Sequence, residues 1–127
     1  MNCMQLCISK VSQVFNLSAI MLLTFSSCTA IIEEDLGSQT IDVIAPRDGA
    51  ASADNVQQFV WDPVEFATEY KFQVAKPEFL MIDKLVIDTV ITISKMTLNL
   101  PPGMYEWRVK ALNNSSETKY FTRRLTV

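Results

Sequence analysis

Alternation of apolar and polar residues dominates the chain from residue 40 to residue 127 and limits what it can fold into. A two-residue period is typical of strands that bury one face, whereas a helix would repeat about every 3.6 residues. This region is therefore predicted to be all-β. The clearest example is residues 69–77, where Tyr70, Phe72 and Val74 are expected to face inward and Lys71 and Gln73 outward.

Clusters of proline, glycine, aspartate and asparagine divide this region into short segments. Such residues are typical of turns, because they favour the backbone angles that reverse the chain. Seven strands separated by turns predict two antiparallel sheets packed as a β-sandwich. The seven expected strands lie within residues 40–46, 56–63, 69–77, 78–95, 96–100, 100–112 and 118–127.

Residues 78–95 do not alternate cleanly, because apolar residues fall on both faces of a strand here. Two interpretations fit this stretch: a strand at the sandwich edge followed by a crossover, or an apolar surface that something else covers. Connecting segments often carry binding residues. We therefore expect ligand contacts at Phe79, Leu80, Met81 and Ile82; the alternative is that these side chains cap an open end of the sandwich.

The large aromatic residues of the alternating segments fall on the inward phase of their strands. This placement favours core packing over a platform for stacking sugars. The residues concerned are Trp61, Tyr70, Tyr105 and Trp107.

Two stretches, FVWDPVEFATEYKFQV (59–74) and LNLPPGMYEWRVKALN (98–113), resemble fibronectin type III domains, an immunoglobulin-like fold. The resemblance covers about residues 41–127. It implies that Trp61 is the core tryptophan of the second strand. It also implies that Leu100 and Tyr105 form a corner in which the tyrosine hydroxyl bonds to the backbone upstream.

The amino-terminal residues 1–27 are predicted to be a secretory signal, because the apolar stretch after Lys10 is too short and too polar to span a bilayer. Residues 23–28, LTFSSC, resemble the lipobox of bacterial lipoproteins, with two small residues before a cysteine. The resemblance implies that Cys28 becomes a lipidated first residue, held on the membrane by acyl chains such as palmitate. The alternatives are ordinary signal cleavage without lipidation, and a helix that belongs to the folded domain.

Residues 28–39 are expected to be an acidic tether between this anchor and the sandwich at residues 40–127. The acidic triplet at residues 33–35 resembles the patch that follows the lipid cysteine in surface-exported lipoproteins of Bacteroidetes. The sandwich pattern also resembles domains of such lipoproteins, including the amino-terminal domain of starch-binding SusE-like proteins. We therefore expect an outer-membrane lipoprotein that faces the periplasm or the cell surface.

Composition argues against several classes of function. The chain has no histidine, which excludes histidine-dependent nucleophilic catalysis and removes the commonest zinc ligand. Its net charge of −3 comes without a basic block, so no nucleic-acid partner is expected. Acids that could form a hydrolytic pair (Asp62, Glu65 and Glu69) or a calcium site (Asp83 and Asp88) lack the expected context. We expect no catalytic residue, no metal and no cofactor beyond a lipid on Cys28.

The sequence predicts a non-catalytic, lipid-anchored module of the bacterial cell envelope that displays a β-sandwich to a protein or a glycan. Two alternatives remain open. The chain is either an accessory component of a polysaccharide-utilisation system, or a truncated amino-terminal domain of a larger lipoprotein.

Overall fold

The computed structural model describes residues 34–127 of the chain. The expected signal peptide and the lipidation site at Cys28 lie outside the described residues. No described residue lies in a helix, so this part of the chain contains no helix that could span a membrane. The strands are β1 (Val43–Ala45), β2 (Ala50–Ala51), β3 (Val56–Trp61), β4 (Glu69–Pro77), β5 (Ile82–Ile91), β6 (Lys95–Asn99), β7 (Met104–Leu112) and β8 (Phe121–Thr126).

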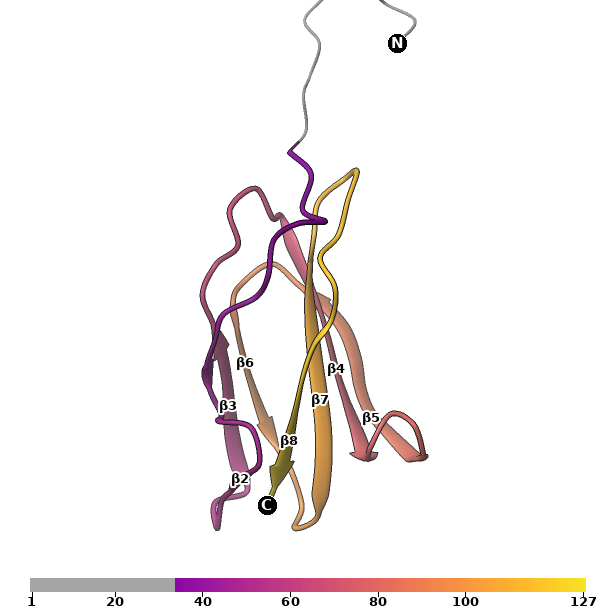
Figure 1. Ribbon diagram of the computed structural model, residues 1–127. Coiled ribbons are helices and arrows are strands. Elements are labelled where there is room, and N and C mark those ends of the chain that lie inside the picture. The colour runs from indigo at the N-terminus through magenta and orange to yellow at the C-terminus, as the bar shows by residue number, and fades with distance from the viewer. Residues whose placement is uncertain (1–33) are drawn as a thin grey trace, which may run out of the picture. The chain divides into compact units, whose positions relative to one another are not determined.

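The strands form two sheets that face each other as a sandwich (Figure 1). The smaller sheet has the order β1-β3-β6, and the larger has the order β2-β8-β7-β4-β5. Consecutive strands β4 and β5 form a hairpin, whereas β5 and β6 belong to different sheets. The expectation of a two-sheet, all-β fold is confirmed.

Two details of the expected fold were wrong. The described residues form eight strands instead of seven, because a two-residue strand, β2, follows the turn at Gly49. The sheets are also not purely antiparallel, since β2 pairs with β8 in parallel. A strand of two residues is too short to show alternation, and Gly49 adopts a positive φ of 71° that turns the chain toward the other sheet.

The core lies between the sheets and consists mainly of aromatic rings. Trp61 from β3 stacks on Phe72 from β4, with ring centroids 5.9 Å apart and planes at 11°. Phe59 meets Phe72 and Trp107 edge-on, each at 5.0 Å. Residues on the inward phase of β3, β4 and β7 are buried, so the alternation identified the core face of these strands.

The segment before β1 also contributes to the core. Leu36 is fully buried, and its backbone N–H donates to Ser116 Oγ at 2.9 Å. The side chain of Asn113 donates to the carbonyl oxygen of Glu34 at 2.8 Å. The described part of the expected tether, residues 34–39, therefore packs against the turn between β7 and β8.

The irregular stretch at residues 78–95 contains β5, which forms one edge of the larger sheet and pairs only with β4. The first of the two interpretations, an edge strand followed by a crossover, is therefore confirmed. Register shifts interrupt the β4–β5 ladder at Val74/Ala75 and at Lys76/Pro77. Such shifts move side chains from one face to the other, which explains why the apolar residues of this stretch do not alternate.

Candidate functional site

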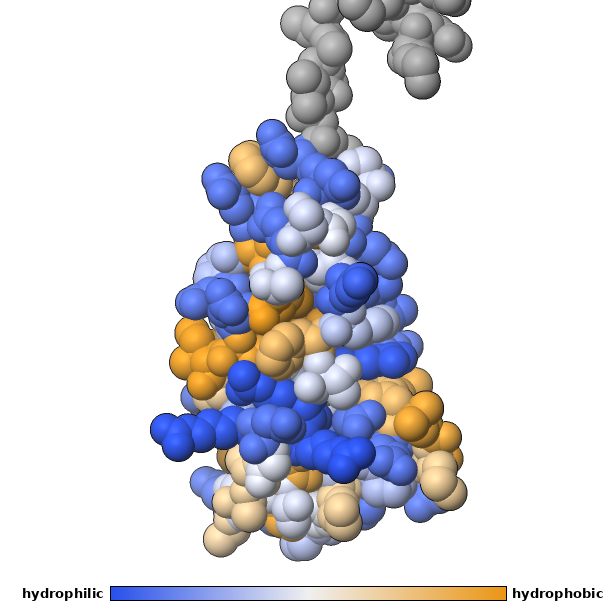
Figure 2. Space-filling model, in the orientation of Figure 1, coloured by the Kyte–Doolittle hydropathy of each residue, from blue (hydrophilic) through white to orange (hydrophobic). Residues whose placement is uncertain are grey.

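The turn between β4 and β5 exposes a group of aliphatic side chains at one end of the sandwich. We call residues Phe79–Ile82 the hairpin tip. Leu80 is 94% exposed and Met81 72% exposed, and Ile82 and Leu85 are each nearly half exposed. Figure 2 shows apolar residues gathered at the lower right of the molecule, where Figure 1 places this hairpin. Removing such exposed apolar side chains from water is favourable, so a group of them marks a surface that a partner can cover.

Phe79 differs from the other three residues that the sequence indicated, because it is half-buried. Its ring lies on the guanidinium group of Arg108, 4.0 Å from ring centroid to guanidinium carbon. Its backbone N–H donates to Glu106 Oε1 at 3.1 Å. Phe79 therefore ties the hairpin tip to β7, while Leu80, Met81 and Ile82 project from that support.

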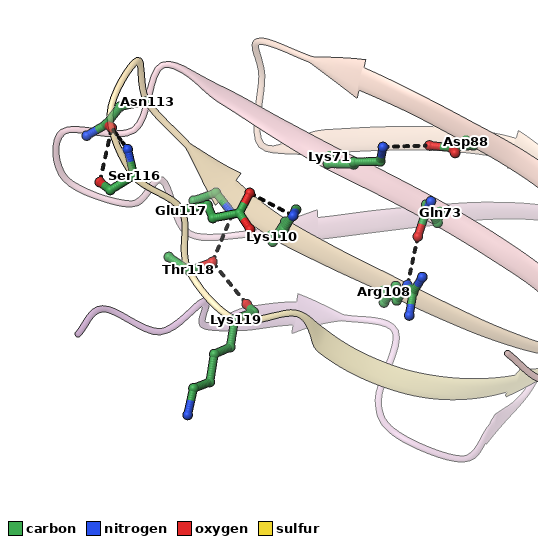
Figure 3. A network of polar contacts seen from close by, with 11 residues as sticks. Lys71, Gln73, Asp88, Arg108, Lys110, Asn113, Ser116, Glu117, Thr118 and Lys119 are labelled. Atoms are coloured by element: carbon green, nitrogen blue, oxygen red, sulfur yellow. Dashed lines mark hydrogen bonds and ion pairs between the residues drawn. The ribbon is translucent and has the colours of Figure 1, made fainter. Parts of the chain in front are cut away.

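Arg108 lies at the centre of the outer face of the larger sheet, held from three sides. In addition to the contact with Phe79, the guanidinium carbon lies 4.2 Å from the centroid of the Tyr120 ring. Gln73, directly opposite on β4, accepts a hydrogen bond from Arg108 Nε at 2.7 Å (Figure 3). We call Phe79, Tyr120, Gln73 and Arg108 the arginine clamp.

Three other cations of this outer face have carboxylate partners. Lys71 pairs with Asp88 at 3.6 Å, and Lys110 with Glu117 at 2.7 Å (Figure 3). Arg124 contacts both Glu78 and Glu106, at 3.3 and 3.4 Å. Within residues 34–127, no carboxylate lies within 4.0 Å of the Arg108 guanidinium.

The structure places the residues that the sequence assigned to the core and to the tyrosine corner in the interior of the domain. Trp61, Tyr70, Leu100, Tyr105 and Trp107 are all buried. The hydroxyl of Tyr70 accepts a hydrogen bond from the Val64 N–H at 2.9 Å, and that of Tyr105 donates to the Pro101 carbonyl oxygen at 2.6 Å. These rings are not available for stacking on a ligand.

The acids considered for chemistry are dispersed on the surface. Asp62, Glu65 and Glu69 are exposed around the β3–β4 connection, and Asp83 and Asp88 lie on the edge strand β5. Within the described part of the chain, no three acidic or cysteine side chains are grouped to hold a metal ion.

A shallow pocket of about 250 Å³ lies beside the hairpin. It is lined by Pro77, Glu78, Met104, Tyr105, Arg124, Leu125 and Thr126. The pocket adjoins the hairpin tip, since Glu78 directly precedes Phe79, and Met104 is itself a largely exposed apolar residue.

Sequence reasoning identified the hairpin tip but not the arginine clamp. Gln73 was expected to face outward, and both Gln73 and Arg108 lie on the outer face of the larger sheet. The sequence does not say that Gln73 and Arg108 face each other, nor that Phe79 and Tyr120 converge on them from separate turns. The sequence also does not indicate that Gln73 is buried, because its burial depends on which residues the strand register places beside it.

Comparison with known proteins supports the fold. No protein-family model matches the chain, and no curated protein sequence matches it. Among solved structures, the fibronectin(III)-like modules of Clostridium thermocellum CbhA are similar, with a TM-score of 0.50 and 11% sequence identity. The match covers 69% of this chain and 95% of that chain.

The fold is thus an all-β, fibronectin type III-like sandwich. The resemblance first suggested by residues 59–74 and 98–113 is confirmed at the level of fold.

Proposed function

We propose that the chain is a lipid-anchored module of a bacterial cell envelope that presents its hairpin tip to a protein partner. The observation that carries this proposal is the exposure of Leu80, Met81 and Ile82 on a supported hairpin. Aliphatic side chains fit a protein surface better than a glycan, because sugars are usually held by free aromatic faces and polar groups. The fibronectin type III-like fold suits a binding or structural role.

The position of the tip supports display away from an anchor. Glu34 is held by Asn113, just beyond the carboxyl end of β7. Phe79 bonds to Glu106, near the amino end of the same strand. The nine residues of β7 span about 30 Å, so the two contacts lie near opposite ends of the sandwich.

The lipid anchor rests on the sequence around Cys28. Cys28 and Glu34 are six positions apart, so the chain between them reaches at most about 22 Å. A lipid on Cys28 would hold the Glu34 end of the sandwich close to the bilayer and point the hairpin tip away from it. The partner then lies in the periplasm or outside the cell, and not in the anchoring membrane.

Two measurements in intact cells test this proposal. Labelling with an alkyne fatty acid is expected to mark the wild-type chain and to leave Cys28→Ser unmarked. A photo-crosslinking amino acid at Leu80 is expected to give a discrete crosslinked protein. The same amino acid at Ile44, which is 59% exposed on β1, is the matched control and is expected to give none. Equal crosslinking at both positions, or none at Leu80, contradicts a contact at the hairpin tip.

A further inference from the structure

We propose that the arginine clamp is a preformed binding site for a carboxylate side chain of the protein partner, continuous with the hairpin tip. This inference rests on the proposed function, since it names the chemistry of the partner that the tip contacts. Phe79 belongs to both features, because it lies in the hairpin tip and its ring stacks on Arg108.

The clamp fixes the orientation of the guanidinium. Stacking against Phe79 and Tyr120 confines its plane, and the hydrogen bond from Nε to Gln73 sets its rotation within that plane. Gln73 is buried, so this acceptor is itself held in place. An arginine that is already immobilised loses little side-chain entropy when it binds a ligand.

The terminal nitrogens of Arg108 remain available. Within residues 34–127, the only hydrogen bond that its guanidinium makes runs from Nε to Gln73. Both terminal NH₂ groups therefore keep their donors, in the planar fork that matches a carboxylate. Because two aromatic rings lie against the guanidinium and exclude water there, an added carboxylate would pair in a partly desolvated setting, where charge pairing is stronger.

Charge on the outer face also favours an anion at this point. Lys71, Lys110 and Arg124 are each neutralised by a neighbouring carboxylate, whereas Arg108 contacts only the neutral groups of the clamp. Of these four cations, Arg108 is the one that has no carboxylate within 4.0 Å among the described residues.

The setting indicates a protein rather than a sugar acid. Phe79 and Tyr120 already direct a ring face at Arg108, so these faces cannot stack on a sugar. The neighbouring exposed side chains, Leu80, Met81 and Ile82, are aliphatic. The site therefore fits an aspartate or glutamate that is flanked by apolar residues in the partner.

A pair of peptides tests this inference on the full chain in detergent micelles. The probe is acetyl-Leu-Asp-Leu-Phe-amide, and its neutral counterpart carries Asn in place of Asp. Binding is followed by the NMR signal of the Arg108 Nε–H group, one of four arginines in the chain, which Arg108→Lys assigns. The acidic peptide is expected to shift this signal together with the backbone amides of Leu80 and Met81. It is expected to bind about 10-fold or more tightly than the neutral peptide.

Two variants separate the clamp from general electrostatics. Arg108→Lys keeps the charge but loses the fork, and is expected to remove the preference for the acidic peptide. Lys71→Gln is the matched control, because Lys71 is already paired with Asp88 and does not lie over either ring of the clamp, and it is expected to keep that preference. Tyr120→Leu, which removes one wall of the clamp, is expected to weaken the preference without removing the positive charge.

Three outcomes overturn the inference: equal affinity of the two peptides, an unchanged preference in Arg108→Lys, or an oligogalacturonate that shifts the Arg108 signal where the acidic peptide does not. The last would assign the clamp to an acidic glycan. Crosslinking at Leu80 without a preference for the acidic peptide would reject the carboxylate site and leave the proposed function standing. A preference for the acidic peptide without crosslinking at Leu80 would support the carboxylate site and reject the proposed contact at the hairpin tip.

Discussion

The hydroxyl of Tyr105 donates a hydrogen bond to the carbonyl oxygen of Pro101, 2.6 Å away and four residues upstream. This bond joins the start of β7 to the turn after β6. Tyr105→Phe keeps the ring and removes the bond, so it is expected to lower the free energy of unfolding by about 0.5–1.5 kcal/mol. Chemical denaturation measures the loss. Tyr120→Phe, whose hydroxyl makes no hydrogen bond within residues 34–127, is the control and is expected to change stability by less.

Ionisation of the same hydroxyl is expected to lower the stability of the domain at alkaline pH. Burial raises the pKa of the Tyr105 phenol above its ordinary value of 10.0. As the pH rises past about 10, the unfolded chain releases this proton first, so the folded state holds more protons and stability falls. The contribution is fully present below about pH 10 and is lost as the pH rises through the folded pKa.

Denaturation of wild type and Tyr105→Phe at pH 8 to about 11 checks this effect, because the other titrating groups are common to both. The difference in stability between them is expected to shrink as the pH rises. A difference that stays constant up to about pH 11 would contradict a raised pKa at Tyr105.

Trp61 is expected to be among the most costly residues to remove. It stacks on Phe72 and meets Tyr70 edge-on at 5.5 Å, and its side chain is fully buried. Trp61→Ala is expected to cost about 3–5 kcal/mol, since it removes this surface and leaves a cavity. Ile93→Ala, at a residue that is 63% exposed, is the control and is expected to cost far less. If the two variants unfold at similar urea concentrations, Trp61 is not part of the packed core.

The sequence predicted most of the sandwich because alternation reports burial directly. Wherever a strand keeps its register, as β7 does, a two-residue period identifies the face that packs inward. β2 has no such signal, since it is only two residues long and its pairing with β8 depends on the turn at Gly49. In β5, the register shifts against β4 interrupt the alternation of apolar and polar residues.

The candidate site was predictable only in part. The hairpin tip was visible as apolar residues without an inward phase, which is a local property of the sequence. The arginine clamp depends on distant segments, because Gln73 and Arg108 are 35 residues apart and meet only through the β4–β7 register. The pattern of a single sequence does not reveal which residues of β4 and β7 face each other.

Leu36 provides a test of a contact that the sequence did not indicate. The residue lies in the expected tether, yet it is fully buried and its backbone bonds to Ser116. Leu36→Ala is expected to cost about 2–5 kcal/mol, as for other buried leucines. Ile44→Ala, at an exposed position on the adjacent strand β1, is the matched control. If both variants unfold at the same denaturant concentration, residues 34–39 are a tether and not a part of the domain.

The two most exposed residues of the hairpin tip, Leu80 and Met81, are expected to contribute little to folding. Leu80 and Met81 are exposed, and replacing both with serine removes apolar surface that is already in water. The double variant Leu80→Ser/Met81→Ser is therefore expected to keep the free energy of unfolding within about 0.5 kcal/mol of wild type, as surface substitutions usually do. Phe79→Ser is the contrasting variant, because it removes the ring that stacks on Arg108, and it is expected to cost more than the double variant. Thermal and urea melts of the three proteins decide the matter. A double variant that loses as much stability as Phe79→Ser would place Leu80 and Met81 within the packed structure and leave no apolar surface there for a partner.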